Sequence, residues 1–267
     1  MWSEAFADAQ AARVAFANKE RSGQVVTEAF AATVDLYTQA EENLRREMTA
    51  CYRATVPPGI RKWQEETAGI GESTLARLLG AVGDPRMAYP RHWEVIDGQR
   101  VLVDDPPHPR LISQLWRYCG VGPAKNRDVK GDAAALMANG RPDAKMLLRL
   151  MAEAQVKSTA KNGTGYRHVY DAVKLKYRDR VHTADCPGGY SGPLYVKCKT
   201  GPGGAYAKAG DPFQPSHVHA IALRITAKEI LRDLWLAAGD EAPALGSSTF
   251  PHGGIYNKDR VFGEVPA

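Results

Sequence analysis

A glycine-rich hairpin between two short helical segments carries the residue types best suited to chemistry in this sequence. It reads Gly69-Ile70-Gly71 and is followed by Ser73 and Thr74. Glycine permits positive φ and places no Cβ between the backbone and a ligand, so the amides here can approach a phosphate oxygen. The start of the next helix adds its dipole to these amides. We therefore interpret the segment as a helix-hairpin-helix that binds the DNA backbone without sequence preference and with sensitivity to salt.

The other residues of this motif have distinct expected roles. Ile70 is the apolar plug that fixes the hairpin between its helices, Ser73 or Thr74 adds a hydroxyl, and Arg77 adds a charge one turn further on. The alternative is that Gly-Ile-Gly forms only a tight turn between two helices, as most isolated Gly-x-Gly sequences do. Helical patterning on both sides and the apolar spacing after the hairpin favour DNA binding over that alternative.

A second Gly-x-Gly sequence, Gly120-Val121-Gly122, closes a helical segment at 111–118 and lies beside a concentration of positive charge. Residues 124–181 contain thirteen Lys/Arg and six Asp/Glu, whereas the whole chain has a net charge of only +5. Basic patches of this kind are typical of nucleic-acid surfaces, although a solvated charged face is the alternative. The basic residues closest to the second hairpin are Lys125, Arg127, Lys130, Arg141, Lys145 and Arg149. Arg141 and Lys145 are one helical turn apart and therefore share a face.

Cysteine and histidine residues gather in a Gly/Pro-rich stretch further along the chain. Their order is His182, Cys186, Cys198, His217 and His219. Zn²⁺ favours four nitrogen or sulfur ligands, and a loop-rich segment with little core would gain from such a staple. We expect Cys186, Cys198 and one of His217 or His219 as the better ligands of a structural zinc, with His182 fourth. Two buried thiols and a histidine pair at a helix start are the alternative.

The elements that must position these residues are predicted to be mainly helical. The range 4–19 reads as a helix, and a longer helix over 25–52 shows a heptad seam of Phe30, Val34, Tyr37, Leu44, Met48 and Cys51. That seam either packs on the N-terminal helix or forms a homodimeric coiled coil.

Further helices are expected over 141–157, 165–180 and 217–238, and a β-hairpin over 93–103 is centred on Asp97-Gly98. The expected fold is thus mainly α, a helix-hairpin-helix core with one small β-hairpin insertion and a loop-rich C-terminal part. We divide the chain into an N-terminal helical region (1–56), a helix-hairpin-helix domain (57–181), a segment that contains the zinc ligands and an amphipathic helix (182–238), and a loose tail (239–267).

Composition sets broad limits on location and partners. The chain has 267 residues, of which 44% are hydrophobic and 24% charged, which is ordinary globular composition. No run of 18 apolar residues and no signal peptide is evident, so we expect a cytoplasmic, nucleoid-associated protein with no membrane partner. Duplex or branched DNA is the expected partner. RNA is the second nucleic acid that we consider. Tyrosines among the basic residues of 166–180 can stack on unpaired bases, and the alternative is that they belong to the core, as tyrosines at helical spacing more often do.

Three blocks of sequence also carry a family resemblance. They are Gly69-Ile70-Gly71 with Ala76, Leu79 and Gly83-Asp84-Pro85; Leu115-Trp116-Arg117-Tyr118-Cys119-Gly120-Val121-Gly122-Pro123; and Ala138-Asn139-Gly140-Arg141 with Leu147-Leu148-Arg149. In order and spacing they resemble the C-terminal domain of the bridge-RNA-guided insertion-sequence transposases, over about residues 30–180. The part that follows is similar to transposase-like proteins of actinobacteria and their phages. The resemblance implies a DNA-binding protein derived from the recombination machinery of a mobile element.

Two departures from the family pattern bear on catalysis. Family members carry an N-terminal RuvC-like nuclease domain, whereas the residues before the hairpin here read as two helices. The family's serine nucleophile corresponds to Asp128, and a carboxylate cannot form the usual phosphoseryl link. We therefore expect DNA binding without strand transfer and assign no catalytic residue. The alternatives are an active recombinase or metal-dependent nuclease, with carboxylates such as Asp128, Asp132 and Asp143 holding metal, and a helical protein-interaction module.

Overall fold

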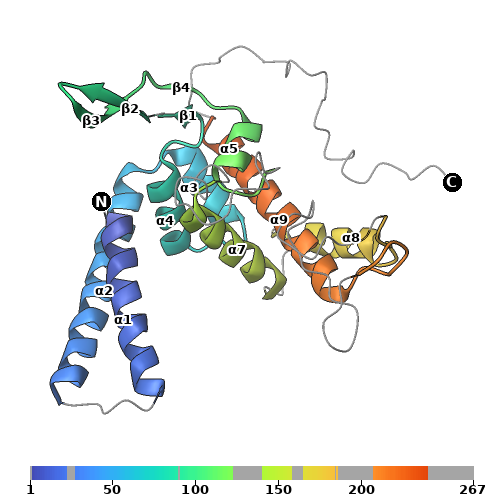
Figure 1. Cartoon of the computed structure of the whole chain (residues 1–267), viewed down its shortest axis with the longest axis horizontal. Helices are drawn as coiled ribbons and strands as arrows, with labels where there is room; N and C mark the ends of the chain where they lie inside the picture. Colours follow the sequence, from blue (N-terminus) through green and yellow to red (C-terminus); the bar gives the residue numbers. More distant parts are fainter. Residues whose placement is uncertain are drawn as a thin grey trace.

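The computed structural model describes residues 2–22, 28–89, 91–122, 140–157, 165–183, 185 and 207–239. Within these ranges the chain is mainly helical and carries a small antiparallel β-hairpin, which confirms the fold class predicted from the sequence (Figure 1). The apolar periodicity of the sequence explains this outcome, because amphipathic helices must bury their apolar faces against one another.

The first two helices form an antiparallel arm that projects from the rest of the molecule (Figure 1). They are α1 (Trp2–Arg21) and α2 (Glu28–Thr55). Phe16 of α1 stacks on Tyr37 and meets Phe30 edge-to-face, so these seam residues of α2 pack on α1. Glu41, which interrupts the seam between Tyr37 and Leu44, accepts a hydrogen bond of 2.5 Å from Arg13 Nε. The seam therefore packs on the N-terminal helix of the same chain, which was the first of the two interpretations. A homodimer through residues 25–52 stays a prediction.

Two short helices follow the arm and enclose the first glycine hairpin. They are α3 (Pro58–Glu66) and α4 (Glu72–Val82). Pro57 and Pro58 separate α3 from α2, since proline cannot continue a helix but suits its first turn. Gly83, with a φ of +71°, ends α4.

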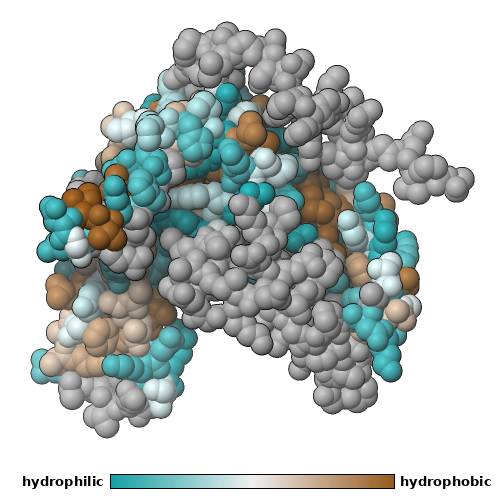
Figure 2. All heavy atoms as spheres, turned by 45° about the horizontal axis from the view of Figure 1, so that its top comes forward, coloured by the Kyte–Doolittle hydropathy of each residue, from teal (hydrophilic) through white to brown (hydrophobic). Residues whose placement is uncertain are grey.

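The β-structure consists of two small antiparallel pairs. Strands β2 (Arg91–Ile96) and β3 (Gln99–Asp104) pair along their length, with Asp97 and Gly98 at positive φ as a type I′ turn requires. Strands β1 (Met87–Ala88) and β4 (His108–Pro109), which the sequence analysis did not predict, pair at its base. Figure 2 shows hydrophobic side chains at the projecting β2–β3 hairpin, where Val95 is 67% exposed.

The remaining helices pack around one long central helix. The central helix is α9 (Pro215–Ala237). The helices that pack around it are α5 (Ile112–Tyr118), α7 (Pro142–Lys157) and α8 (Arg167–Tyr177). Helix α9 contacts α3, α5, α7 and α8, and its Ile230, Leu231 and Leu234 are fully buried. A single apolar core joins α9 to residues of α2, α3 and α4. None of the helices in the described ranges is long and apolar enough to cross a membrane.

Candidate nucleic-acid interface

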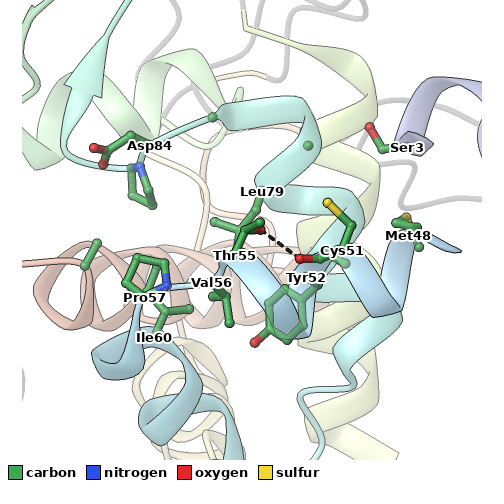
Figure 3. Close-up of a pocket in the computed structure, with 15 residues that line it drawn as sticks. Ser3, Met48, Cys51, Tyr52, Thr55, Val56, Pro57, Ile60, Leu79 and Asp84 are labelled. Atoms are coloured by element: carbon green, nitrogen blue, oxygen red, sulfur yellow. Dashed lines mark hydrogen bonds between the residues drawn. The ribbon is translucent and has the colours of Figure 1, made fainter. Parts of the chain in front are cut away.

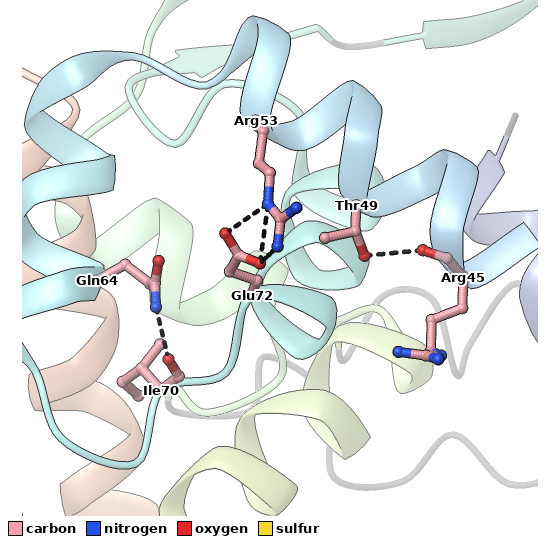
Figure 4. Close-up of polar contacts among 6 residues, drawn as sticks. All are labelled: Arg45, Thr49, Arg53, Gln64, Ile70 and Glu72. Atoms are coloured by element: carbon pink, nitrogen blue, oxygen red, sulfur yellow. Dashed lines mark hydrogen bonds and ion pairs between the residues drawn. The ribbon is translucent and has the colours of Figure 1, made fainter. Parts of the chain in front are cut away.

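The first glycine hairpin has the conformation that its sequence requires. Gly69 has a φ of +82°, which L-residues with a Cβ rarely adopt. Ile70 is buried in the core between α3 and α4, and its carbonyl accepts a 3.0 Å hydrogen bond from Gln64 Nε2 (Figure 4). The plug role predicted for Ile70 thus matches its packing, and the hairpin is fixed to α3 by a side chain as well as by the chain itself.

A buried glutamine supports the hairpin from beneath. Gln155 of α7 is fully buried, and a Cβ at Gly69 would lie 2.7 Å from its Nε2 atom. Its Oε1 atom accepts a 2.9 Å hydrogen bond from Tyr166 N, and a Cβ at Gly165 would lie 2.7 Å from that oxygen. The sequence analysis missed Gln155. The available signal was its position on the apolar stripe of α7, at helical spacing from Leu148 and Met151.

A second polar network attaches α3 to the central helix below the hairpin. Trp63 Nε1 donates to Tyr166 Oη at 3.2 Å, and that hydroxyl donates to Asp233 Oδ2 of α9 at 2.8 Å. Burial and the neighbouring Asp233 carboxylate both raise the pKa of Tyr166, so the phenol stays protonated and remains a donor. The hairpin therefore rests on a polar network that involves α3, α8 and α9.

The start of α4, in contrast, is open to solvent. Gly71 is the exposed N-cap residue, with a φ of −81°, and no side chain caps the helix. A Cβ at Gly71 would meet no atom of the described residues within 4 Å. Ser73 and Thr74 follow in the first turn and are partly exposed. The first amides of a helix lack intrahelical acceptors, so this end presents uncapped donors and the positive end of the α4 dipole.

An ion pair lies at this same helix start (Figure 4). Glu72, the first residue of α4, receives two hydrogen bonds from Arg53 of α2, Nε to Oε1 at 3.0 Å and Nη2 to Oε2 at 2.6 Å. These bonds from Arg53 hold the pKa of Glu72 below its ordinary value. Arg61 Nη2 donates to the Arg53 carbonyl. The start of α4 therefore brings together Arg53, Arg61 and the Glu72 carboxylate, and Glu65 also acts on the neighbouring Tyr52. The sequence analysis had picked out neither arginine.

Arg77 does not add its charge to the hairpin, as the sequence analysis expected. Its guanidinium packs over the ring of Phe6 at 4.8 Å from the centroid. Burial lowers the pKa of Arg77, and the charge of nearby Glu41 partly opposes that effect. The side chain is therefore part of the contact between α4 and the α1–α2 arm, so we leave it out of the candidate interface.

The second Gly-x-Gly sequence serves packing rather than ligand approach. The amides of Val121 and Gly122 both donate to the carbonyl of Trp116, at 2.9 and 2.8 Å, and the Gly120 amide donates to Arg117. A Cβ at Gly140 would lie 2.4 Å from Gly120 N, so the end of α5 and the start of α7 meet backbone to backbone. Because these amides already have acceptors, we leave Gly120 and Gly122 out of the candidate interface.

The basic strip is described only in part. Arg141 donates to both oxygens of Asp143, at 3.1 and 2.7 Å, and this pairing raises the pKa of Arg141. Lys145 is exposed one turn further along α7, where its amide bonds to the Arg141 carbonyl. Asp143 is therefore engaged by Arg141 and by the Ala144 amide. Five further predicted residues lie outside the described ranges, namely Lys125, Arg127, Lys130, Asp128 and Asp132.

The predicted zinc ligands are also described in part. The rings of His182 and His217 lie 5.5 Å apart between centroids, whereas His219 instead bonds through Nδ1 to the Tyr170 hydroxyl at 2.7 Å. Cys186 and Cys198 lie outside the described residues. Within the part of the chain that is described, no group of three or more His, Cys, Asp or Glu side chains is arranged to hold a metal ion.

A mostly apolar cavity of about 500 Å³ lies between α2, α3 and α4 (Figure 3). Its wall includes Met48, Val56 and Leu79, together with the carboxylate of Asp84 and the exposed thiol-bearing Cys51. Among the described residues no histidine, lysine or second carboxylate lines it, so the described lining has no acid–base pair of the kind that catalysis at a carboxylate or thiol ordinarily needs. We therefore regard the hairpin, rather than this cavity, as the candidate functional site.

Comparison of the chain with models of protein families found no match. No curated protein and no solved structure matched it either.

Proposed function

We propose that this protein binds DNA without sequence preference, through the sugar-phosphate backbone at the hairpin Gly69-Ile70-Gly71. One observation carries the proposal. Gly71 is exposed at the start of α4, which no side chain caps, and a Cβ there would meet no atom of the described part of the chain within 4 Å. The fold does not need a glycine at such a position for space, whereas a phosphate approaching the α4 amides does.

Arginine side chains at the hairpin can also bind an anionic partner. Arg53 and Arg61 lie beside Glu72, and Arg53 is largely exposed. A phosphate oxygen near the α4 amides would compete with the Glu72 carboxylate for the same Arg53 donors, which suit a phosphate as well as a carboxylate. Contacts of this kind go to the backbone of DNA, so we expect little dependence on base sequence and strong dependence on salt.

The resemblance to bridge-RNA-guided transposases supports the same function and suggests its origin. We infer a transposase-derived protein that retains DNA handling in recombination but lacks strand-transfer chemistry, because Asp128 occupies the position of the serine nucleophile. Duplex or branched DNA is the proposed partner. A nucleoid-associated location in the cytoplasm would follow from that partner.

The test is a gel-shift series on duplex, single-stranded and four-way DNA with Gly71→Val. We expect at least a tenfold loss of affinity, because the added side chain projects into the space proposed for phosphate while the protein interior stays unchanged. The matched control is Ala15→Val, at an exposed position on α1, which should bind as the unmodified protein does. Circular dichroism and thermal unfolding show whether both variants stay folded.

Three outcomes distinguish this proposal from its rivals. Equal affinity of Gly71→Val and Ala15→Val would remove the hairpin from the interface. Absence of salt-dependent binding to any DNA would favour the protein-interaction module instead. Nicking of DNA in Mg²⁺ or Mn²⁺, abolished by Asp128→Asn or Asp132→Asn, would favour the recombinase or nuclease.

A further inference from the structure

Helix α8 ends in a cluster of positive charge that lies outside the hairpin. The segment 167–180 holds five Lys or Arg and two Asp. Four of the five cations fall in residues 174–180, which we call the basic end of α8, and all four are exposed. They are Lys174, Lys176, Arg178 and Arg180. Figure 1 shows α8 at the end of the molecule opposite the α1–α2 arm, so this surface is separate from the arm.

Neighbouring carboxylates cancel only part of this charge. Arg167 Nε donates to Asp171 at 2.8 Å, and Arg178 Nε lies 3.2 Å from Asp179 Oδ1. The other described residues of this half of the molecule, 181–183, 185 and 207–239, hold four Lys/Arg and four Asp/Glu, so they leave the excess of three positive charges unchanged. Within the described ranges, the cations of α8 that have no carboxylate within 4.0 Å are Lys174, Lys176 and Arg180.

The tyrosine rings beside these cations are largely closed to a partner. Tyr166 is 6% exposed and Tyr170 is 4% exposed, so both belong to the core. Tyr177 is half-buried, and the Arg180 guanidinium lies 5.7 Å from the centroid of its ring. Stacking on unpaired bases needs open aromatic faces, whereas contacts to phosphates need only exposed cations. The basic end of α8 therefore suits a partner whose negative charges are spaced along a backbone.

The path of α8 links its basic end to the hairpin. Tyr166 N, directly before α8, donates at 2.9 Å to Oε1 of Gln155, the side chain that lies beneath Gly69. The helix thus begins next to the support of the hairpin. A rise of about 1.5 Å per residue places Lys176 about 15 Å further along. One DNA strand carries a phosphate about every 3.4 Å of duplex axis, so this length corresponds to about four or five base pairs.

We propose that the basic end of α8 is a second contact to the sugar-phosphate backbone of duplex DNA, separate from the contact at Gly71. The inference rests on the DNA binding proposed above and extends it in two ways. It adds a surface that supplies charge, whereas the hairpin supplies backbone amides. It also favours duplex over unpaired nucleic acid, because the buried tyrosines of α8 leave cations rather than rings to make the contact.

The experiment measures the salt dependence of binding to a labelled duplex by fluorescence anisotropy, with the full-length chain. Each phosphate that a cation neutralises contributes about 0.9 to the slope of log affinity against log salt. The triple variant Lys174→Gln, Lys176→Gln and Arg180→Gln should therefore lower that slope by between about two and three. It should also weaken binding at least tenfold at about 50 mM salt.

The matched control removes the same net charge from another exposed surface. It combines Lys19→Gln, Arg21→Gln and Arg45→Gln on the α1–α2 arm. Lys19 lies over the Phe16 ring at 5.6 Å, much as Lys174 lies over the Tyr170 ring at 5.5 Å, so the control also loses one such contact. Distant charges are screened within about 10 Å at 0.1 M salt, so this control should bind as the unmodified protein does.

The outcomes separate this inference from the function on which it rests. If the α8 variant binds as the arm control does while Gly71→Val still loses affinity, the hairpin stands and the α8 contact is overturned. If the α8 variant loses affinity and slope while Gly71→Val does not, the α8 contact stands and the hairpin is removed from the interface. If the unmodified chain binds no DNA, both proposals fall.

Two further measurements test the partner and the fold. Tighter binding to single-stranded DNA or RNA than to duplex would overturn the assignment to duplex. Binding to phosphatidylserine vesicles that the α8 variant loses, with DNA affinity unchanged, would assign the surface to a membrane and overturn the proposal. Lys176→Gln alone changes one exposed side chain and should still lower the salt slope by about one, so the test does not depend on the triple variant being folded.

Discussion

Substitution of Gly69 by alanine should destabilise the protein through two separable effects. The first is conformational, because Gly69 has a φ of +82° and alanine is disfavoured in that region. The second is steric, because the added Cβ would lie 2.7 Å from Gln155 Nε2. Gln155 is fully buried in α7 and cannot move into solvent without breaking its bond to Tyr166 N.

The magnitudes of these effects follow from their causes. A left-handed conformation costs a residue with a Cβ about 1–2 kcal/mol relative to glycine. Displacement of Gln155 leaves the Tyr166 amide as a buried donor without its acceptor, which costs about 1–3 kcal/mol. Gly69→Ala should therefore lower the free energy of unfolding by roughly 2–5 kcal/mol, a large part of the stability of an ordinary domain.

A double-mutant cycle in urea can separate the two effects. In a Gln155→Ala background the obstructing amide is absent, so Gly69→Ala should cost only the conformational part, about 1–2 kcal/mol. The coupling energy between positions 69 and 155 should then be about 1–3 kcal/mol. Gly71→Ala is the matched control within the same hairpin, and its cost should stay within about 1 kcal/mol, the loss of a favourable N-cap residue.

Equal costs of Gly69→Ala in the two backgrounds would refute this reasoning. The hairpin would then owe its shape to its own backbone alone, and Gln155 would have no part in supporting it. A cost of Gly71→Ala as large as that of Gly69→Ala would contradict the assignment of an open α4 start.

Three further predictions concern charge and thiols. Arg53→Gln should weaken DNA binding several-fold and reduce its salt dependence, whereas Glu72→Gln should strengthen binding by removing a competing carboxylate; fluorescence anisotropy at low and high salt measures both. Because Arg53 lowers the pKa of Glu72 in the folded state, the stabilisation is present above the unfolded value near 4.5 and is lost as pH falls below it. Glu72→Gln should therefore flatten the fall in stability between about pH 5 and pH 3, as urea titrations can show. Burial raises the pKa of Cys119 to about 12, so iodoacetamide should modify the exposed Cys51 in the native protein and Cys119 only after unfolding, as peptide mapping would reveal.

Sequence patterns over a few residues were sufficient to predict the individual helices and the β-hairpin. Apolar spacing predicted the long second helix, and α2 uses Phe30 and Tyr37 of that seam against Phe16. The dipeptide Asp97-Gly98 predicted the β-hairpin, because both residues tolerate positive φ and the turn needs it. These features depend on residues a few positions apart, which is the range over which sequence patterns are informative.

Contacts between residues far apart in the sequence could not be predicted from such patterns. The Arg53–Glu72 pair spans 19 positions, and the approach of Gly140 to the Gly120 amide spans 20 positions. Arg77 was expected to face the hairpin, since helical spacing alone does not say that Phe6 of another helix covers it. In each case the outcome is fixed by how whole helices pack, which is a property of the assembled core.

The two glycines of the first hairpin separate a folding role from a binding role. If the hairpin were only a tight turn, the fold would be expected to need both glycines. Gly69 meets that expectation, through its positive φ and the close Gln155 side chain. Gly71 does not, since its backbone is extended and, within the described ranges, a Cβ there would meet no atom within 4 Å. The hairpin is therefore packed and hydrogen-bonded from beneath while the helix start above it is exposed, an arrangement that would let a phosphate bind with little reorganisation of the protein.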